Sequence, residues 1–286
     1  MKNESINLKE GITLQNDDVF PTNSIVQLSS LTSMPSRKGL EQAVISNGNI
    51  VNVVSDSYGH LPNERYFNEV EAKLINADVE YITRSINRDD RSFAVDYILN
   101  DERYAIIVKN GMDKIRPMLR FTNSYDGSCK TSGHFGFFRE VCSNGLHVAH
   151  STIGFSVKHR GSIAEIVLPE IGHLVRTFMD NEYYTLQKQF EQMAAKPIYD
   201  ISEFVKQTAN ATGLFKYESS EKNPEPSLNA RLVMEYMAKE VQLMGEQRAN
   251  NWIGYNAFNE LLHGKLKKTF EVQKREDAKL FEYVLA

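Results

Sequence analysis

The chain has 286 residues, of which 41% are hydrophobic and 24% are charged, and its formal net charge is −4. This hydrophobic content is enough for a folded core and excludes a largely disordered chain. No uninterrupted apolar run reaches the length of a membrane-spanning helix, and the polar N-terminus lacks the pattern of a secretion signal. Two cysteines are too few for a disulfide scaffold. Together these features predict a soluble cytoplasmic protein.

Three segments of different character follow one another along the chain. Residues 1–22 are polar and predict a flexible arm. Residues 23–167 carry the alternation and turn residues of an antiparallel sheet with one helix. From residue 168 apolar residues recur every three or four positions, which predicts a helical region over 168–286 that either covers the sheet or stands apart. The predicted fold class is α+β.

The sheet-forming part begins with a predicted hairpin, in which Asn47-Gly48 joins residues 43–45 to residues 50–54. Pro62 then opens a helix, because its missing N–H is not needed in a first turn. The remaining strands are predicted over 79–86 and 92–99, which form a second hairpin, and over 104–108, 115–122, 134–142 and 147–157.

The helical part begins with a periodic apolar pattern from Leu168 to Met193, and Pro169 is expected to start this helix. A shorter helix over 200–208 is expected to end before Gly213. The segment 218–227 is polar, contains two prolines and predicts a surface loop. The last helices are predicted over 228–244, 252–263 and 271–284.

Positive charge is concentrated in one part of this acidic chain. Between Lys109 and Arg160, eight basic residues stand against three acidic ones, so that this stretch carries +5 and the rest of the chain −9. Because binding depends on the local field, the excess favours a surface that faces a polyanion. An ordinary solvated sheet face would carry the same residues, and this alternative stays open.

Aromatic residues interleave with these cations. Six rings lie in the same stretch, and single-stranded nucleic acid needs this combination, because cations bind phosphates and ring faces stack on bases. In the alternative interpretation, Phe135 and Phe137 point from one face of a half-buried strand into the core. Phe138 points to the opposite face, so we predict that Phe138 and Tyr125 stack on bases.

Signatures of known enzyme sites are missing or incomplete. The sequence has no phosphate-binding loop, zinc-protease helix, nucleophile elbow or dinucleotide-binding turn. Cys129, His134, Cys142, His147 and His150 include residue types that bind zinc, but their spacing does not match zinc knuckles. We therefore predict free thiols, no metal and no cofactor.

Four segments resemble landmarks of the family called domain of unknown function 932. They are Val54-Ser-Asp-Ser-Tyr58, Thr122-Asn-Ser-Tyr-Asp-Gly-Ser128, Phe138-Arg-Glu-Val-Cys-Ser-Asn-Gly-Leu146 and Tyr255-Asn-Ala-Phe258. The chain departs from the pattern at Asn259, where the family favours Thr or Ser. The resemblance implies no reaction and no catalytic residue. It implies a phage, prophage or plasmid setting, in which DNA replication, recombination and interference with host defence are common roles.

The sequence therefore predicts a non-catalytic protein of a phage or mobile element that binds nucleic acid, single-stranded DNA above all, in recombination or replication. It is also expected to form homo-oligomers. The predicted phosphate contacts and stacking residues are Arg116, Arg120, Tyr125, Lys130, Phe138, Arg139, Lys158 and Arg160. The residues predicted to shape two tight loops are Asn123, Asp126, Gly127, Asn144 and Gly145.

Two other functions stay open at this point. One is a protein-binding module that inhibits or modulates a host defence factor through exposed faces of the C-terminal helices. The other is an enzyme with Asp126 and His134 in an Asp-Gly-Ser loop site.

Overall fold

The computed structural model describes residues 20, 22–33, 37–88, 90–108, 113–139, 145–146, 154–177, 183–220, 223–266, 268 and 270–286. Antiparallel sheets lie mainly in the first half of the chain and helices toward the C-terminus, so the α+β prediction is confirmed. The arm predicted over 1–22 lies almost entirely outside the described residues. Within the described segments, no helix is long and apolar enough to cross a membrane.

The chain divides into two compact units that do not follow sequence order. Unit 1 contains Met1–Tyr104, Met118–Phe135 and Ile153–Asp180, and unit 2 contains Ala105–Pro117, Gly136–Thr152 and Asn181–Ala286. The strands β7 (Asp113–Ser124) and β8 (Thr131–Arg139) contribute residues to both units. The domain boundary predicted between residues 167 and 168 stays a prediction.

Unit 1 is built on two antiparallel sheets. The small sheet has the order β1–β2–β3, and its turn at Asn47-Gly48 has φ values of 51° and 79°, as the Asn-Gly signal predicts. The larger sheet follows the order β10–β8–β7–β5–β4. The bounds of the remaining strands are β1 (Asn23–Gln27), β2 (Gln42–Ser46), β3 (Asn49–Val54), β4 (Tyr81–Arg88), β5 (Ser92–Leu99) and β10 (Gly154–Val157).

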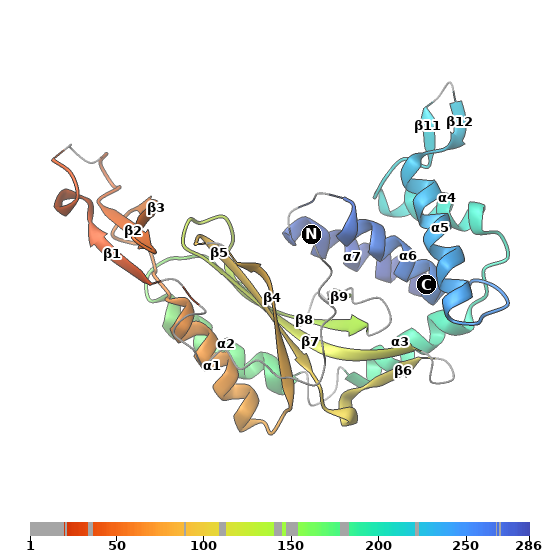
Figure 1. Ribbon diagram of the computed structural model, residues 1–286, viewed down its shortest axis with the longest axis horizontal. Coiled ribbons are helices and arrows are strands. Elements are labelled where there is room, and N and C mark those ends of the chain that lie inside the picture. Colours follow the sequence, from red (N-terminus) through yellow and green to blue (C-terminus); the bar gives the residue numbers. More distant parts are fainter. Residues whose placement is uncertain are drawn as a thin grey trace. The chain divides into compact units, whose positions relative to one another are not determined.

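Two helices, α1 (Asn63–Asn76) and α2 (Ile163–Thr177), pack side by side in unit 1 (Figure 1). α1 starts directly after Pro62, as predicted. Its Tyr66 ring packs edge-on against Phe121 of β7, with ring centroids 6.0 Å apart. The Tyr66 hydroxyl donates to the carbonyl oxygen of Ser132 in β8 at 2.9 Å. These two contacts fasten α1 to the sheet.

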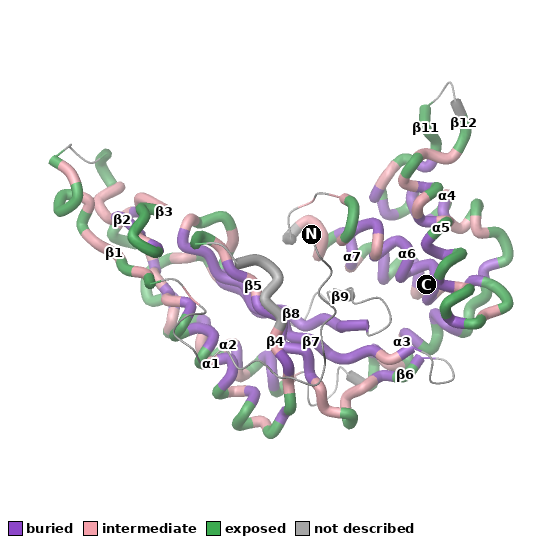
Figure 2. The backbone as a smooth tube through the Cα atoms, in the orientation of Figure 1, coloured by how far each residue is buried: buried purple, intermediate pink, exposed green. Residues whose placement is uncertain are grey.

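Strands β7 and β8 are buried nearly throughout (Figure 2). Of the 12 residues of β7 only Lys114 is not buried, and all nine residues of β8 are buried. A buried polar or charged side chain is tolerated only when it is hydrogen-bonded or paired. Each arginine on these strands therefore requires a hydrogen-bonding or charged partner.

Unit 2 is mainly helical. The rings of Phe190, Trp252 and Phe281 meet in its core, with Phe190 4.8 Å from Trp252 and 6.0 Å from Phe281 between centroids. Strands β6 (Ile106–Val108) and β9 (Gly145–Leu146) pair with β7 and β8. The other elements are α3 (Tyr183–Ala195), α4 (Ile201–Thr212), β11 (Glu218–Ser220), β12 (Asn223–Pro226), α5 (Leu228–Leu243), α6 (Asn251–Gly264) and α7 (Phe270–Leu285).

A buried carboxylate joins α6 to α7. Oδ1 of Asp277 accepts hydrogen bonds from the Tyr255 hydroxyl at 2.9 Å and from Asn259 Nδ2 at 2.8 Å. Burial raises the pKa of Asp277, and the hydrogen bond from His263 acts in the opposite direction. Asn259, at which the sequence departs from the family pattern, therefore supplies a donor to this carboxylate.

Two predicted elements need correction. The single helix predicted from Leu168 to Met193 is two helices, α2 and α3, and α2 begins at Ile163, so Pro169 lies inside it rather than at its start. A proline removes one helical hydrogen bond, and Pro169 is exposed, so water can reach the carbonyl that is left free. The segment 218–227, predicted as a loop, contains the short β11–β12 hairpin, and its last residue, Ser227, caps α5.

Gly133→Ala is expected to destabilise unit 1, because its methyl group would lie 2.5 Å from Cε1 of Phe155 and 2.7 Å from Cε1 of Phe121. Overpacking of this kind costs about 1–3 kcal/mol. Gly172→Ala in α2 is the matched control, because its methyl group meets only the flexible Lys73 side chain at 3.6 Å. Alanine at this position should stabilise the helix by up to about 1 kcal/mol. Urea denaturation followed by circular dichroism measures both, and equal midpoints would contradict this packing.

Candidate nucleic-acid interface

The predicted phosphate-binding arginines are buried. Arg116, Arg120 and Arg139 have exposed fractions of 5%, 6% and 1%. Arg120 of β7 lies opposite Asp96 of β5 in the strand register and donates to both oxygens of its carboxylate, at 2.6 and 2.9 Å. A buried arginine offers no face to a nucleic-acid phosphate, so these three positions do not fit the role predicted for them.

Arg139 joins two carboxylates within unit 2. Its Nε donates to both oxygens of Asp113 at 2.8 and 2.7 Å, and its two terminal nitrogens donate to Glu240 of α5, each at 2.8 Å. The indole N–H of Trp252 in α6 donates to the same Asp113 at 2.8 Å. Burial alone lowers the pKa of Arg139, but the hydrogen bonds to Glu240 and Asp113 raise it well above its usual value. The guanidinium of Arg139 therefore stays charged, and it links strands β7 and β8 to helix α5 directly and to α6 through Asp113.

The residues predicted to stack on bases are buried as well. Tyr125 has no exposed surface, and its hydroxyl accepts a hydrogen bond from the backbone N–H of Asn63 at 2.9 Å. Phe138 is 3% exposed, and Phe135 and Phe137 are also buried. The sequence predicted one buried and one exposed face of β8, but both faces of this strand are buried. The structure places all three phenylalanines in the core.

Three of the predicted cations are exposed, and all three lie in unit 1. β10 pairs with β8 so that Val157 lies opposite Thr131, and Lys158 and Lys130 are the residues directly beyond this last pair. Both lysines are exposed, and so is Arg160. None of the three has an ion-pair partner among the described residues. We call Lys130, Lys158 and Arg160 the cation surface.

The segment that carries Lys158 and Arg160 passes directly against residues 57–59. The backbone N–H of Gly161 donates to the carbonyl of Ser57 at 2.9 Å, and a methyl group on Gly59 would lie 2.7 Å from the carbonyl oxygen of Gly161. Only glycine permits so close an approach of two backbones. Next to this crossing Tyr58 stacks on His159, with ring centroids 5.4 Å apart. The cation surface therefore adjoins a pair of stacked rings.

Hydrogen bonds connect His159 to the sheet. Its Nε2 lies 3.3 Å from Oγ1 of Thr131, and its Nδ1 lies 3.3 Å from the carbonyl oxygen of Gly59. Thr131 donates to Oδ1 of Asn123 at 2.8 Å, and Nδ2 of Asn123 donates to the carbonyl of Leu61 at 2.9 Å. Asn123, predicted to shape a loop, therefore lies fully buried within β7 and links the sheet to the start of α1.

The other predicted loop residues lie in different settings. Between β7 and β8, Oδ1 of Asp126 accepts from the backbone N–H of Ser128 at 2.9 Å, and Gly127 has a φ of 76°. This is the turn geometry that Asp-Gly favours. Gly145 lies in β9 opposite Phe138, whereas Asn144 is outside the described residues.

The alternative sites are described only in part. Cys129 is a free, partly exposed thiol, whereas Cys142, His147 and His150 lie outside the described residues. His134 is buried in β8. In the described part of the chain, no cluster of three His, Cys, Asp or Glu side chains is placed to hold a metal ion.

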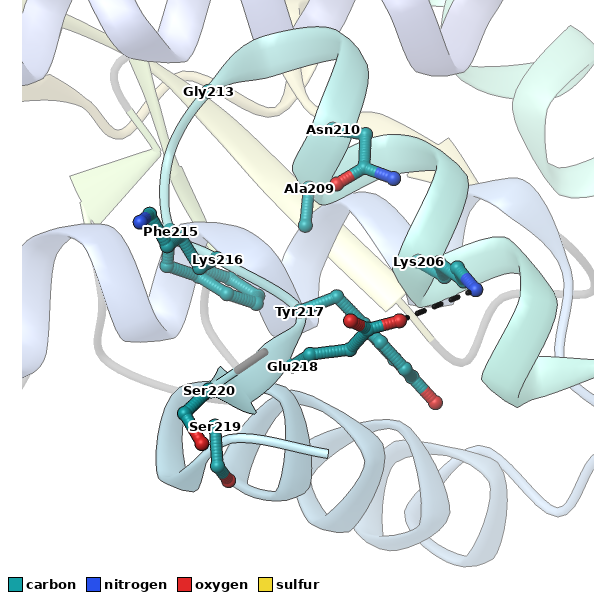
Figure 3. Close-up of a pocket in the computed structure, with 10 residues that line it drawn as sticks. All are labelled: Lys206, Ala209, Asn210, Gly213, Phe215, Lys216, Tyr217, Glu218, Ser219 and Ser220. Carbon is teal, nitrogen blue, oxygen red and sulfur yellow. Dashed lines mark ion pairs between the residues drawn. The ribbon is translucent and has the colours of Figure 1, made fainter. Parts of the chain in front are cut away.

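Unit 2 has a hollow beside α4 and β11 (Figure 3). Its lining residues are Lys206, Ala209, Asn210, Gly213, Phe215, Lys216, Tyr217, Glu218, Ser219 and Ser220. Lys206 pairs with Glu218 at 3.6 Å and lies 5.8 Å from the ring centroid of Tyr217. A phosphate that enters this hollow would have to compete with Glu218 for the lysine. No described carboxylate forms an ion pair with a residue of the cation surface, which is therefore the better phosphate site.

Sequence reasoning missed Tyr58 and His159 as site residues. Tyr58 ends one of the four family-like segments, and His159 stands between two cations of the predicted phosphate-binding set. The place of His159 between Lys158 and Arg160 is the signal that could have identified it. No local pattern connects it with Tyr58, because their stacking arises only when the chain folds.

Comparisons with known proteins place the chain in one family. A family model described as "Domain of unknown function (DUF932)" matches residues 50–282. No curated protein and no solved structure matches. The resemblance seen in the four sequence segments is therefore confirmed, whereas the phage or plasmid setting stays a prediction.

Arg139→Met is expected to lower the free energy of unfolding of unit 2 by about 3–5 kcal/mol, because Asp113 and Glu240 would stay buried without a cation. Trp252, the single tryptophan of the chain, lies in this network, so its fluorescence during urea denaturation reports on unit 2. Adding Asp113→Asn and Glu240→Gln should recover much of the loss, because both charges are then removed. A loss below about 1 kcal/mol for Arg139→Met would contradict the charge pairing.

Proposed function

The chain belongs to the family described as "Domain of unknown function (DUF932)", and for this member we propose nucleic-acid binding at the cation surface of unit 1, with single-stranded DNA as the preferred ligand. The observation that carries the proposal is that Lys130, Lys158 and Arg160 are exposed, with Lys130 and Lys158 directly beyond the last residue pair of β8 and β10. A polyanion would neutralise both lysines and the nearby Arg160, which have no ion-pair partner among the described residues.

The Tyr58 hydroxyl beside these cations is enclosed by the protein. It is buried and has no hydrogen-bond partner among the described residues. Burial above all, with the charges of Asp126 and Cys129, raises the pKa of Tyr58 to about 12, so the hydroxyl remains a donor at neutral pH. Because the hydroxyl is enclosed, a ligand at the cation surface meets the ring of Tyr58 and not its hydroxyl.

Single strands fit this surface better than a rigid duplex. The half-buried rings of Tyr58 and His159 lie beside the cations, and a base can stack on an aromatic ring only when it is not paired inside a helix. The proposed activity is binding without catalysis. A role in recombination or replication of a mobile element belongs to the same proposal and rests on the family resemblance.

The local charge excess is small. Asp56 and Asp126 belong to the segments that adjoin the cation surface and offset part of its charge. The proposed complex therefore depends on a few phosphate contacts, and salt should weaken it through the counterions that these contacts release.

Lys130→Ala combined with Lys158→Ala is expected to lower the slope of log affinity against log salt by about 1.4, since each phosphate contact contributes about 0.7 on single strands. Fluorescence anisotropy of a labelled oligothymidylate, titrated at several salt concentrations, measures this slope. The melting temperature should stay the same, because exposed lysines without ion pairs contribute little to stability.

The matched control is Lys188→Ala combined with Lys265→Ala, which removes the same charge from exposed positions of unit 2. This variant should keep the native slope. Absence of binding by the native protein at low salt would overturn the proposed function. Equal slopes for the two double variants would overturn the assignment of binding to the cation surface.

A further inference from the structure

The contacts around His159 determine which atom donates and which accepts in each hydrogen bond. The carbonyl of Leu61 can only accept, so Nδ2 of Asn123 must face it, and Oδ1 of Asn123 is left as an acceptor. Thr131 has one hydroxyl proton, which it donates to this Oδ1 at 2.8 Å. Oγ1 of Thr131 can then only accept a proton from Nε2 of His159, 3.3 Å away.

The second ring nitrogen of His159 also needs a proton. Nδ1 lies 3.3 Å from the carbonyl oxygen of Gly59, which can only accept. A neutral imidazole carries one ring proton, so one contact in the chain from Gly59 through His159 and Thr131 to Asn123 lacks its proton. An imidazolium carries two and satisfies every contact. The network is complete only when His159 is charged.

The groups around His159 determine when it gains this charge. Burial lowers the pKa of His159, and the hydrogen bond to Gly59 opposes that shift. Burial and then the charge of His159 lower the pKa of His60. The other titratable residues of the adjoining segments are Asp56, Tyr58, Glu64, Tyr125, Asp126, Cys129, Lys130, Lys158, Arg160 and Glu165. At neutral pH His159 is therefore neutral in the free protein. One hydrogen bond between Gly59, His159, Thr131 and Asn123 then lacks its proton.

We infer that His159 takes up a proton from solvent when a nucleic-acid phosphate binds at the cation surface, so that binding is linked to pH. The inference rests on the proposed function. A phosphate beside Lys158 and Arg160 adds negative charge near the ring, which favours the charged form of His159. The added proton completes the contacts to Thr131 and Gly59, and these contacts hold the segment that presents both cations.

Isothermal titration calorimetry of the full chain with oligothymidylate tests this inference. Titrations in buffers of different ionisation enthalpy, at one pH and one salt concentration, count the protons taken up on binding. We expect uptake that approaches one proton at neutral pH. The affinity should rise as the pH falls from about 8 to about 6, by at most about tenfold per pH unit, which is the limit for one proton.

His159→Gln removes the titrating group but keeps an N–H that can reach Thr131, so this variant should bind without proton uptake. His60→Gln is the matched control and should keep the uptake. Binding without uptake by the native protein, or the same uptake in His159→Gln, overturns the inference and leaves the proposed function standing. No binding at any pH overturns the proposed function itself.

Nitrogen NMR of the native protein keeps the test open if His159→Gln does not fold. The chemical shifts of the two ring nitrogens distinguish a neutral imidazole from an imidazolium. The ring of His159 should change from the neutral to the charged pattern when oligothymidylate is added at neutral pH. A ring that stays neutral in the complex overturns the inference.

Discussion

A buried guanidinium has to meet a carboxylate, and this requirement organises both units of the protein. Arg120 meets Asp96 between β7 and β5, and Arg139 meets Asp113 and Glu240. Moving an ion out of water costs several kcal/mol, and only close pairs with several hydrogen bonds offset that cost. The strands β7 and β8 can therefore be buried although they carry charge. Because these arginines are internal, the cation surface is the exposed remainder of the predicted phosphate contacts.

The regular elements could be predicted because their signals are local, whereas the site could not be. Asn47-Gly48 determines a turn by its own backbone preference, and the apolar spacing of each late helix lies within that helix. Charge pairing is not local: Asp96 lies 24 residues from Arg120, and Glu240 lies 101 residues from Arg139. A count of charges along one stretch omits these carboxylates, and it therefore presents internal arginines as surface cations.

The family-like segments serve two physical purposes. The first two contribute Tyr58 and Asn123 to the contacts beside the cation surface. The last two contribute Arg139, which ties strands to helices, and Tyr255, which donates to the buried carboxylate of Asp277. Half of the pattern therefore maintains the core of unit 2. The other half positions the ring and the hydrogen bonds on which the proposed binding depends.

Photo-cross-linking tests most directly whether DNA lies at the cation surface. An oligothymidylate that contains 5-bromodeoxyuridine is irradiated with the native protein, and the modified peptides are identified by mass spectrometry. The account predicts adducts within residues 55–60 and 157–161, where Tyr58 and His159 present their rings beside Lys158 and Arg160. Adducts confined to α3–α7, with none in these two segments, would contradict it.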